Sequence, residues 1–271
     1  MKINLSKIFP YLLGIFPVAC LFGACQKSDT SVNQPSHLNI HLTDGPADYQ
    51  AVLINVQKVT VKSSDDTSDS GWVDVPLLKP GIYDLLQLRN GKDTLLGGVD
   101  LPAGKLSQIR LVLGDGNQLV LDNGTVVDLK TPSAQQSGLK LNVDATLTAG
   151  IPYELVLDFD AARSIVKAGN SGQYILKPVI RAFAKASGGA IQGVVLPDSA
   201  KAHIMAISGT DTLGALPDTS GFYKIQGLPA GSYTLIFNPD SATAYQSATL
   251  QNIAVTAGNV TTVDTLRLTH R

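Results

Sequence analysis

Apolar and polar residues alternate along most of the chain beyond residue 37. A period of two places successive side chains on opposite faces of a strand, so this alternation predicts half-buried β-strands. The clearest sets are Leu38/Ile40/Leu42, Ile109/Leu111/Leu113 and Tyr153/Leu155/Leu157/Phe159. No apolar pattern at helical spacing runs long enough for a major helix, so the pattern indicates an all-β protein.

One strand contains a break in its alternation. Val52, Ile54 and Val56 share one face, and the phase then slips to Val59 and Val61. One extra residue in a strand shifts the side-chain phase in this way, which predicts a β-bulge near Gln57 and Lys58.

Turn residues and shorter apolar runs complete the first half of the chain. Asp122-Asn123-Gly124 separates two short strands and predicts a hairpin, since Asn-Gly adopts positive φ angles readily. We also expect strands at Trp72–Val75 and Tyr174–Phe183, and one or two helical turns at Gly81–Leu88 and Asp160–Val166.

The Gly/Ser segment Lys185–Gly189 predicts a domain boundary. We therefore expect a β-sandwich over residues 37–186 and a smaller, independently folded β-sandwich over residues 188–271. The strands expected in the smaller domain are Ile191–Leu196, Ala202–Ile207, Phe222–Ile225, Tyr233–Phe237 and Val260–Leu268.

The first residues have the pattern of a bacterial lipoprotein signal. Lys2 and Lys7 precede an apolar run that Pro10 and Pro17 interrupt, which is too short and broken for a transmembrane helix. Cys25 follows Gly-Ala and precedes polar residues. We expect residues 1–24 to be removed, Cys25 to be acylated and residues 25–36 to be a flexible tether to a bacterial membrane, most simply the outer one; a plain secretory signal is the alternative.

Charge excludes one class of partner. The chain has 21 Lys and Arg against 22 Asp and Glu. Removing residues 1–24 takes away two lysines and no acids, which leaves 19 basic against 22 acidic residues and a net charge of -3. A nucleic-acid-binding protein needs a basic surface to displace phosphate counterions, so no nucleic-acid partner is expected.

Two sets of acidic residues are candidates for ligand binding. Asp158 and Asp160 share a strand face at a spacing of roughly 6–7 Å, which overlaps the carboxylate spacing of inverting glycosidases. In the structural interpretation, Asp160 caps the following helical turn and Arg163 neutralises the pair. Asp44 and Asp48 flank a Gly-Pro turn, where Asp44 either bonds backbone amides or binds a ligand.

Other chemistry finds little support in the sequence. The four histidines are scattered, and no third ligand lies near His37 and His41, so we expect no metal and no cofactor. No nucleophile elbow, phosphate-binding loop or His-Glu-x-x-His motif is present, so we assign no catalytic residue.

The first domain resembles a bacterial lipoprotein family defined by a domain of unknown function, DUF4382. The resemblance covers the whole first domain and implies no activity. It rests on Leu38–Tyr49, Leu101–Gly104 with Ile109–Leu111, Gln136–Lys140, Asp158–Ile165 and Leu176–Ile180.

The second domain resembles a carboxypeptidase regulatory-like, transthyretin-type module. The matching segments are Ile191–Val195, Ser220–Ile225 and Leu228–Tyr233. In such a module Gly193 avoids crowding within a strand, and the hydroxyl of Tyr233 bonds backbone across the turn. The resemblance implies a non-catalytic spacer, although some relatives of the fold bind carbohydrate.

Three functions remain open after the sequence is read. The first is a non-enzymatic, membrane-anchored binding module for a carbohydrate or an envelope protein. The second is a structural spacer or assembly component. The third is a hydrolase that acts on polysaccharide or peptide, for which Asp158 and Asp160 would be the acids.

Overall fold

The computed structural model describes residues 34–45, 47–62, 70–131, 138–169 and 172–271. Cys25 and the signal segment lie outside these residues. Strands dominate the fold, as the alternation predicted, and no helix in the described part of the chain has the length and apolar character needed to cross a membrane. Ser31–Arg271 forms one compact unit with two separate buried clusters, one in each predicted domain.

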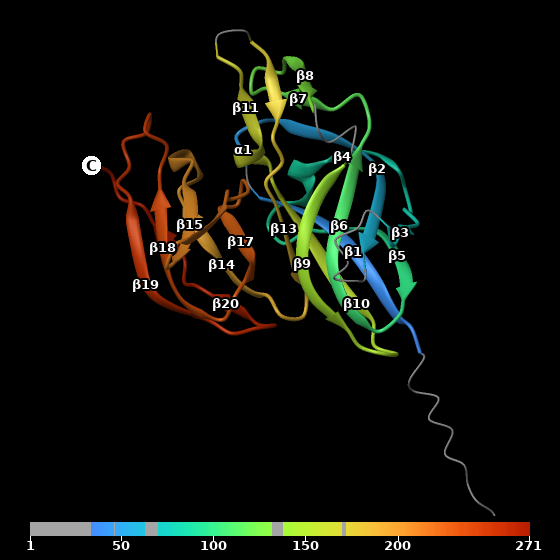
Figure 1. The fold of residues 1–271 in the computed structure, drawn as a ribbon. Coiled ribbons are helices and arrows are strands. Elements are labelled where there is room, and N and C mark those ends of the chain that lie inside the picture. The colour runs from blue at the N-terminus through green and yellow to red at the C-terminus, as the bar shows by residue number, and fades with distance from the viewer. Residues whose placement is uncertain (1–33, 46, 63–69, 132–137, 170–171) are drawn as a thin grey trace, which may run out of the picture. The chain divides into compact units, whose positions relative to one another are not determined.

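The first sheet of the first domain has the strand order β13-β10-β1-β5 (Figure 1). Its central pair, β1 and β10, is parallel, whereas both outer pairings are antiparallel. Leu38, Ile40 and Leu42 are fully buried against the second sheet, as predicted. The strands span Ile180–Ala184 (β13), Tyr153–Asp160 (β10), Ser36–Gly45 (β1) and Thr94–Leu101 (β5).

The second sheet is larger and follows the order β11-β12-β8-β7-β2-β6-β9, with β3 and β4 also paired to β2. The register of β2 against β6 shifts between Val56 and Lys58, which confirms the predicted bulge. The strands span Ile165–Lys167 (β11), Tyr174–Leu176 (β12), Val126–Lys130 (β8), Gln118–Val120 (β7), Ala51–Lys62 (β2), Gly104–Leu113 (β6), Leu139–Leu147 (β9), Trp72–Val75 (β3) and Gly81–Asp84 (β4).

Two sequence predictions in the first domain need correction. The strand expected at Tyr174–Phe183 is two strands, β12 and β13, which belong to different sheets. Pro178 lies between them and has no N–H for a ladder, so the strand ends there. Helical turns were expected over the whole of Gly81–Leu88, but only the second half of this segment is helical. Strand β4 occupies the first half, and Asp84 caps the 3-10 helix η2 (Leu85–Leu88) that follows.

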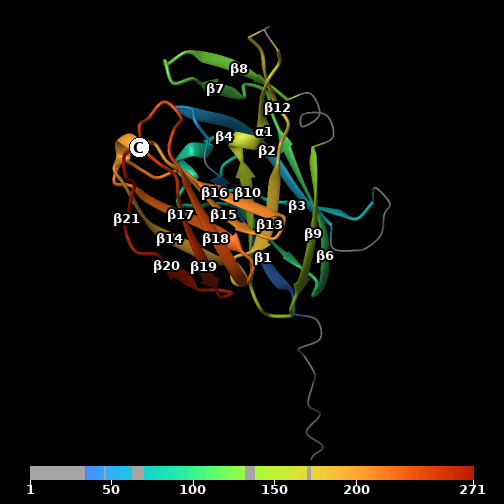
Figure 2. The ribbon, with the colours of Figure 1, turned by 90° about the vertical axis from the view of Figure 1, so that its left-hand side faces the viewer.

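The second domain is a sandwich of two four-stranded sheets (Figure 2). The strand expected at Val260–Leu268 is two short strands, and β16 and β19 were not predicted. One sheet contains β14 (Gly189–Leu196), β17 (Phe222–Leu228), β20 (Val260–Thr262) and β21 (Leu266–Arg267). The other contains β15 (His203–Ser208), β16 (Asp211–Ala215), β18 (Gly231–Asn238) and β19 (Ala248–Val255), and a 3-10 helix, η3 (Asp198–Ala200), precedes β15.

Two local features expected in the second domain, the Tyr233 hydrogen bond and the close packing at Gly193, are present. The hydroxyl of Tyr233 donates to the carbonyl of Pro229 at 2.9 Å, as predicted. A Cβ on Gly193 would lie 2.7 Å from the hydroxyl of the buried Tyr223, so only glycine fits there. The sequence Leu-Pro-Ala-Gly occurs twice, at Leu101–Gly104 between β5 and β6 and at Leu228–Gly231 between β17 and β18. In both places it carries the chain from one sheet to the other.

Candidate functional site

The structure separates the five predicted ligand residues into a cluster of three acids and two residues outside it. Asp44, Asp158 and Asp160 lie where β1 and β10 end, since the parallel register places Thr43 opposite Asp158 and Gly45 opposite Asp160. All three acids line a small cavity of about 40 Å³. Asp48 lines a larger groove, and Arg163 lines neither the cavity nor the groove.

Asp158 is paired with a residue that the sequence analysis did not single out. Its carboxylate accepts a hydrogen bond from the guanidinium of Arg181 on β13. Arg163 was expected to neutralise both Asp158 and Asp160, and that expectation was wrong for Asp158. Burial raises the pKa of Asp158 and the nearby Asp160 adds to this, while Arg181 opposes it.

Asp160 caps the short helix α1 (Ala161–Ser164), as predicted. Its carboxylate accepts a hydrogen bond from the backbone N–H of Arg163 at 2.9 Å, and the Nε of Arg163 lies 3.6 Å from the same carboxylate. The side chain of Arg163 is 62% exposed, so this ion pair contributes little beyond the cap.

Asp44 is buried, and in the described chain only one of its two carboxylate oxygens has a hydrogen bond. One carboxylate oxygen accepts from the backbone N–H of Ala161 at 3.2 Å, and the other has no hydrogen-bond partner among the described residues. Burial raises the pKa of Asp44 well above its usual value, and the charges of Asp158 and Asp160 act in the same direction. These contacts hold the ends of β1 and β10 to α1, so they account structurally for the acids.

A second polar network lies on the outer face of the first sheet. His41 lies between two carboxylates, with Nδ1 2.7 Å from Asp93 and Nε2 2.6 Å from Glu154. Lys185 bonds Asp93 at 2.9 Å. The bonds from Lys185 and His41 outweigh burial and lower the pKa of Asp93, and a bond from Asn39 at 2.7 Å together with that of His41 does the same for Glu154. With both ring nitrogens occupied, His41 has no free nitrogen for a substrate or a metal.

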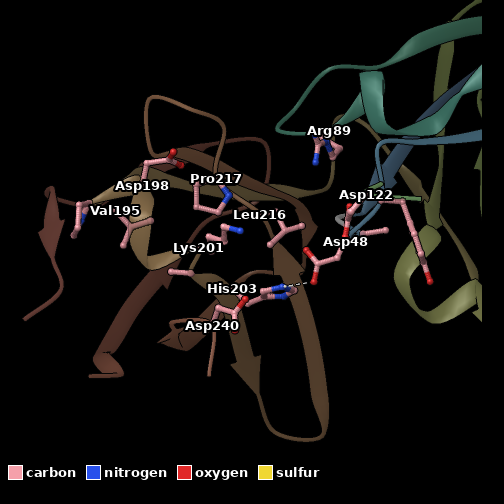
Figure 3. A pocket seen from close by; sticks show the side chains of 14 residues that line it. Asp48, Arg89, Asp122, Val195, Asp198, Lys201, His203, Leu216, Pro217 and Asp240 are labelled. Carbon is pink, nitrogen blue, oxygen red and sulfur yellow. Dashed lines mark hydrogen bonds and ion pairs between the residues drawn. The ribbon is translucent and has the colours of Figure 1, made fainter. Parts of the chain in front are cut away.

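A groove of about 580 Å³ lies among the described residues (Figure 3). Residues from both domains line it, and an exposed hydrogen bond of 3.1 Å between Asp48 and His203 crosses it. The first domain contributes Ala47, Asp48, Tyr49, Arg89 and Asp122, and the second contributes Val195, Pro197, Asp198, Lys201, Ala202, His203, Leu216, Pro217 and Asp240.

The groove combines charged groups with apolar surface. Figure 3 shows Asp48 and Arg89 facing the same space as Lys201 and His203. Tyr49, Leu216 and Pro217 provide apolar area between these charges. Such a lining suits a ligand that has hydroxyl groups on a partly apolar ring, because it offers hydrogen-bond donors and acceptors beside flat apolar contacts.

Lys201 is held in an uncommon backbone conformation at the edge of the groove. It follows η3 with a φ of 44°, in the left-handed region. The other non-glycine residues with positive φ in the described chain are Asn90 and Asn252, and asparagine tolerates this region better than lysine does. Strain of this kind is often found at functional sites.

Sequence reasoning identified Asp48 and missed the rest of the groove. Arg89, Asp122 and Lys201 lie in three separate loops with no shared motif, and His203 was noted only as one of four scattered histidines. No group of three His, Cys, Asp or Glu side chains in the described ranges is spaced to hold a metal ion.

Solved structures with some likeness to the chain are distant. A chain of a type II cohesin–X-dockerin complex from Acetivibrio cellulolyticus is 23% identical over 29% of this chain and 56% of that one, with a TM-score of 0.24. The Bacillus anthracis TIE protein is 13% identical over 87% of this chain and 34% of its own, with a TM-score of 0.22. The Streptococcus agalactiae minor pilin GBS52 is 11% identical over 87% and 96%, with a TM-score of 0.22.

The chain thus spans little more than half of the first of these structures and about a third of the second. No curated protein matches the chain.

Family comparisons agree with the two domains. A carboxypeptidase regulatory-like domain matches residues 190–269, which contain the second sandwich with its Tyr233 turn. The domain of unknown function DUF4382 matches residues 35–178, more than half of the chain. The chain therefore belongs to the DUF4382 family and has a carboxypeptidase regulatory-like domain after the family domain.

Proposed function

We propose that this protein is a non-enzymatic lipoprotein of a bacterial cell envelope that binds a glycan in the groove between Asp48 and Lys201. It is anchored to the outer membrane through an acylated Cys25. The groove itself is the observation that carries the binding proposal.

The dimensions of the groove favour a short glycan over a protein partner. Pockets for small ligands are concave and enclose roughly 300–1,000 Å³, and this groove has about 580 Å³. A stable protein interface instead buries about 800 Å² on each partner, over a much flatter surface. A single saccharide chain of a few units fits the groove with its hydroxyls near the charged side chains.

The acids at the ends of β1 and β10 support binding without hydrolysis. A glycosidase needs one acid that is free to protonate the leaving oxygen and a second that is free to attack or to activate water. Asp158 is instead bonded to Arg181, and Asp160 to the backbone of Arg163. Both carboxylates are thus committed to structural contacts.

A glycan array tests the binding proposal. We expect the mature chain from residue 26, which contains the whole compact unit, to bind at least one class of oligosaccharide. Leu216→Trp would fill the groove and abolish that binding, while Val126→Trp adds the same ring at a residue that is 55% exposed and lies outside the groove lining. Equal binding by both variants would place the ligand elsewhere.

Two further outcomes of that experiment identify the rival functions. Binding to no glycan would favour the structural spacer. Release of shortened saccharides from a bound glycan would make the protein a hydrolase, and either result overturns the proposal.

The anchor is tested separately. Mass spectrometry of the mature N-terminus should find a diacylglyceryl-modified Cys25, and Cys25→Ser should move the protein from the detergent phase to the aqueous phase. An unmodified peptide that begins at another residue would contradict the lipid anchor.

A further inference from the structure

We infer that the groove selects amino sugars that have free, protonated amines over neutral and acidic saccharides. This inference rests on the proposed glycan binding and names the class of glycan.

The acidic side chains of the groove outnumber the basic ones. Asp48, Asp122, Asp198 and Asp240 face the charges of Arg89 and Lys201, so the lining has a net charge of -2 with His203 neutral and -1 with His203 protonated. Over a groove of this size such an imbalance attracts a cation and repels a carboxylate.

Asp122 and Asp198 differ from the other two acids in their contacts. In the parts of the chain that the structure describes, the carboxylates of Asp122 and Asp198 make no hydrogen bond or ion pair. Asp48 is bonded to His203, and one oxygen of Asp240 accepts the N–H of Ala242. Asp122 and Asp198 are therefore available to a ligand ammonium, one from each wall of the groove.

The two basic side chains differ in how far their charges are already engaged within the protein. The Nε of Arg89 donates to the carbonyl of Leu86 at 2.8 Å, and its charge acts on the buried Asp44, whose pKa it helps to lower against the raising effect of burial. Lys201 has no bonded partner for its ammonium in the described chain. One fully available cation thus faces two fully available anions.

The expected selectivity is moderate. A ligand ammonium beside an exposed carboxylate gains only a modest attraction, because water screens the pair. The groove is open to solvent, so we expect about a tenfold difference in affinity, which corresponds to 1.4 kcal/mol.

Matched saccharides test this inference. Titration calorimetry near pH 6, where carboxylates and sugar amines are both charged, would compare a chitosan tetrasaccharide with the fully N-acetylated chitin tetrasaccharide. The two share one backbone and differ in charge. A tetragalacturonate serves as the acidic probe. We expect the chitosan tetrasaccharide to bind about tenfold more tightly than the chitin one, and the acidic one to bind most weakly.

Salt and substitutions identify the source of the preference. The difference should largely disappear near 1 M salt, where the screening length falls to about 3 Å. Asp122→Asn and Asp198→Asn should each reduce it by about threefold and leave stability unchanged. Asp128→Asn and Asp264→Asn are controls, because both carboxylates are exposed and outside the groove lining.

The possible failures are distinguishable. Equal binding of the charged and acetylated tetrasaccharides, or tightest binding of tetragalacturonate, would overturn the selectivity and leave glycan binding standing. If no saccharide binds either here or on the array, the proposed function itself falls.

Discussion

The first and second domains are each stabilised by side-chain hydrogen bonds, but these bonds span different distances along the sequence. In the second domain the hydroxyl of Tyr233 reaches a carbonyl four residues away, and Asp218 bonds the backbone of Ser220 and Phe222 within one turn. In the first domain the matching contacts join residues more than 110 positions apart: Ser36 to Ile151, Asn39 to Glu154 and Asp44 to Ala161.

This difference decides what a substitution does. A local contact affects one turn, and its loss is confined to the strands beside it. A distant contact fixes how strands from different parts of the chain are arranged, so its loss affects the whole sheet.

The largest effect is expected from Arg181→Met. This change leaves the carboxylate of Asp158 buried without its partner, and breaking a buried pair costs about 3–5 kcal/mol. Because a third of the Arg181 side chain is exposed, we expect the lower end of that range. Urea unfolding of the mature chain measures it. The double variant Asp158→Asn/Arg181→Met should recover most of the loss, and a simple sum of the two single effects would contradict a coupled pair.

A smaller effect, confined to the second domain, is expected from Gly193→Ala. The added methyl group meets the hydroxyl of buried Tyr223 at 2.7 Å, and overpacking of this kind costs about 1–3 kcal/mol. Tyr223→Phe removes the closest contact and leaves two ring carbons at 3.0 and 3.1 Å, so the double variant should recover part of the loss. Near-UV circular dichroism during thermal unfolding would follow the change. A loss that Tyr223→Phe does not rescue would mean that strand β14, and not the ring contact, is at fault.

Asp160→Ala removes the cap of α1 and should cost about 0.5–2 kcal/mol. Asp160→Asn retains an acceptor for the N–H of Arg163 and serves as the matched control. Calorimetric melting temperatures give the comparison, and glycan binding by the folded variant should be intact. If Asp160→Ala kept full stability yet lost binding or a hydrolytic activity, these acids would replace the groove as the best candidate site.

Asp44→Asn changes the shape of the side chain least, and its effect on the free energy of unfolding depends on pH. Burial raises the pKa of Asp44 in the folded protein above its unfolded value, so the folded state binds a proton more tightly. That contribution is fully present below the unfolded pKa and is lost as the pH rises through the folded pKa. We therefore expect Asp44→Asn to match the native protein at low pH and to exceed it in stability at neutral pH. Chemical unfolding across that range measures the difference, and a gap that widens toward low pH would contradict the burial argument.

Much of the fold could be predicted because its signals are local. The alternation at Leu38–Leu42 gave a buried strand face, and the phase slip after Val56 gave a bulge at the correct residues. The Tyr233 turn needed only four residues of sequence. The strand expected at Tyr174–Phe183 failed because a single proline sends its two halves to different sheets.

The candidate site was mostly unpredictable for the opposite reason. Asp48 and His203 are 155 residues apart and lie on different domains, and no sequence pattern relates them. Arg181 became the partner of Asp158 through the antiparallel register of β10 and β13, while the nearer Arg163 serves only Asp160. Pairing by proximity in sequence therefore gave the wrong counter-charge.

The position of β1 also determines the order in which the first domain can be completed during synthesis. The antiparallel partner of Ser36 is Leu101, and the parallel partner of Leu38 is Tyr153. A chain made from its N-terminus thus delivers β1 first and its second neighbour more than a hundred residues later. Until then one edge of β1 has unpaired N–H and C=O groups, which pair readily with other chains. Closing so long a loop is slow, so the new chain spends its most aggregation-prone period waiting for β10.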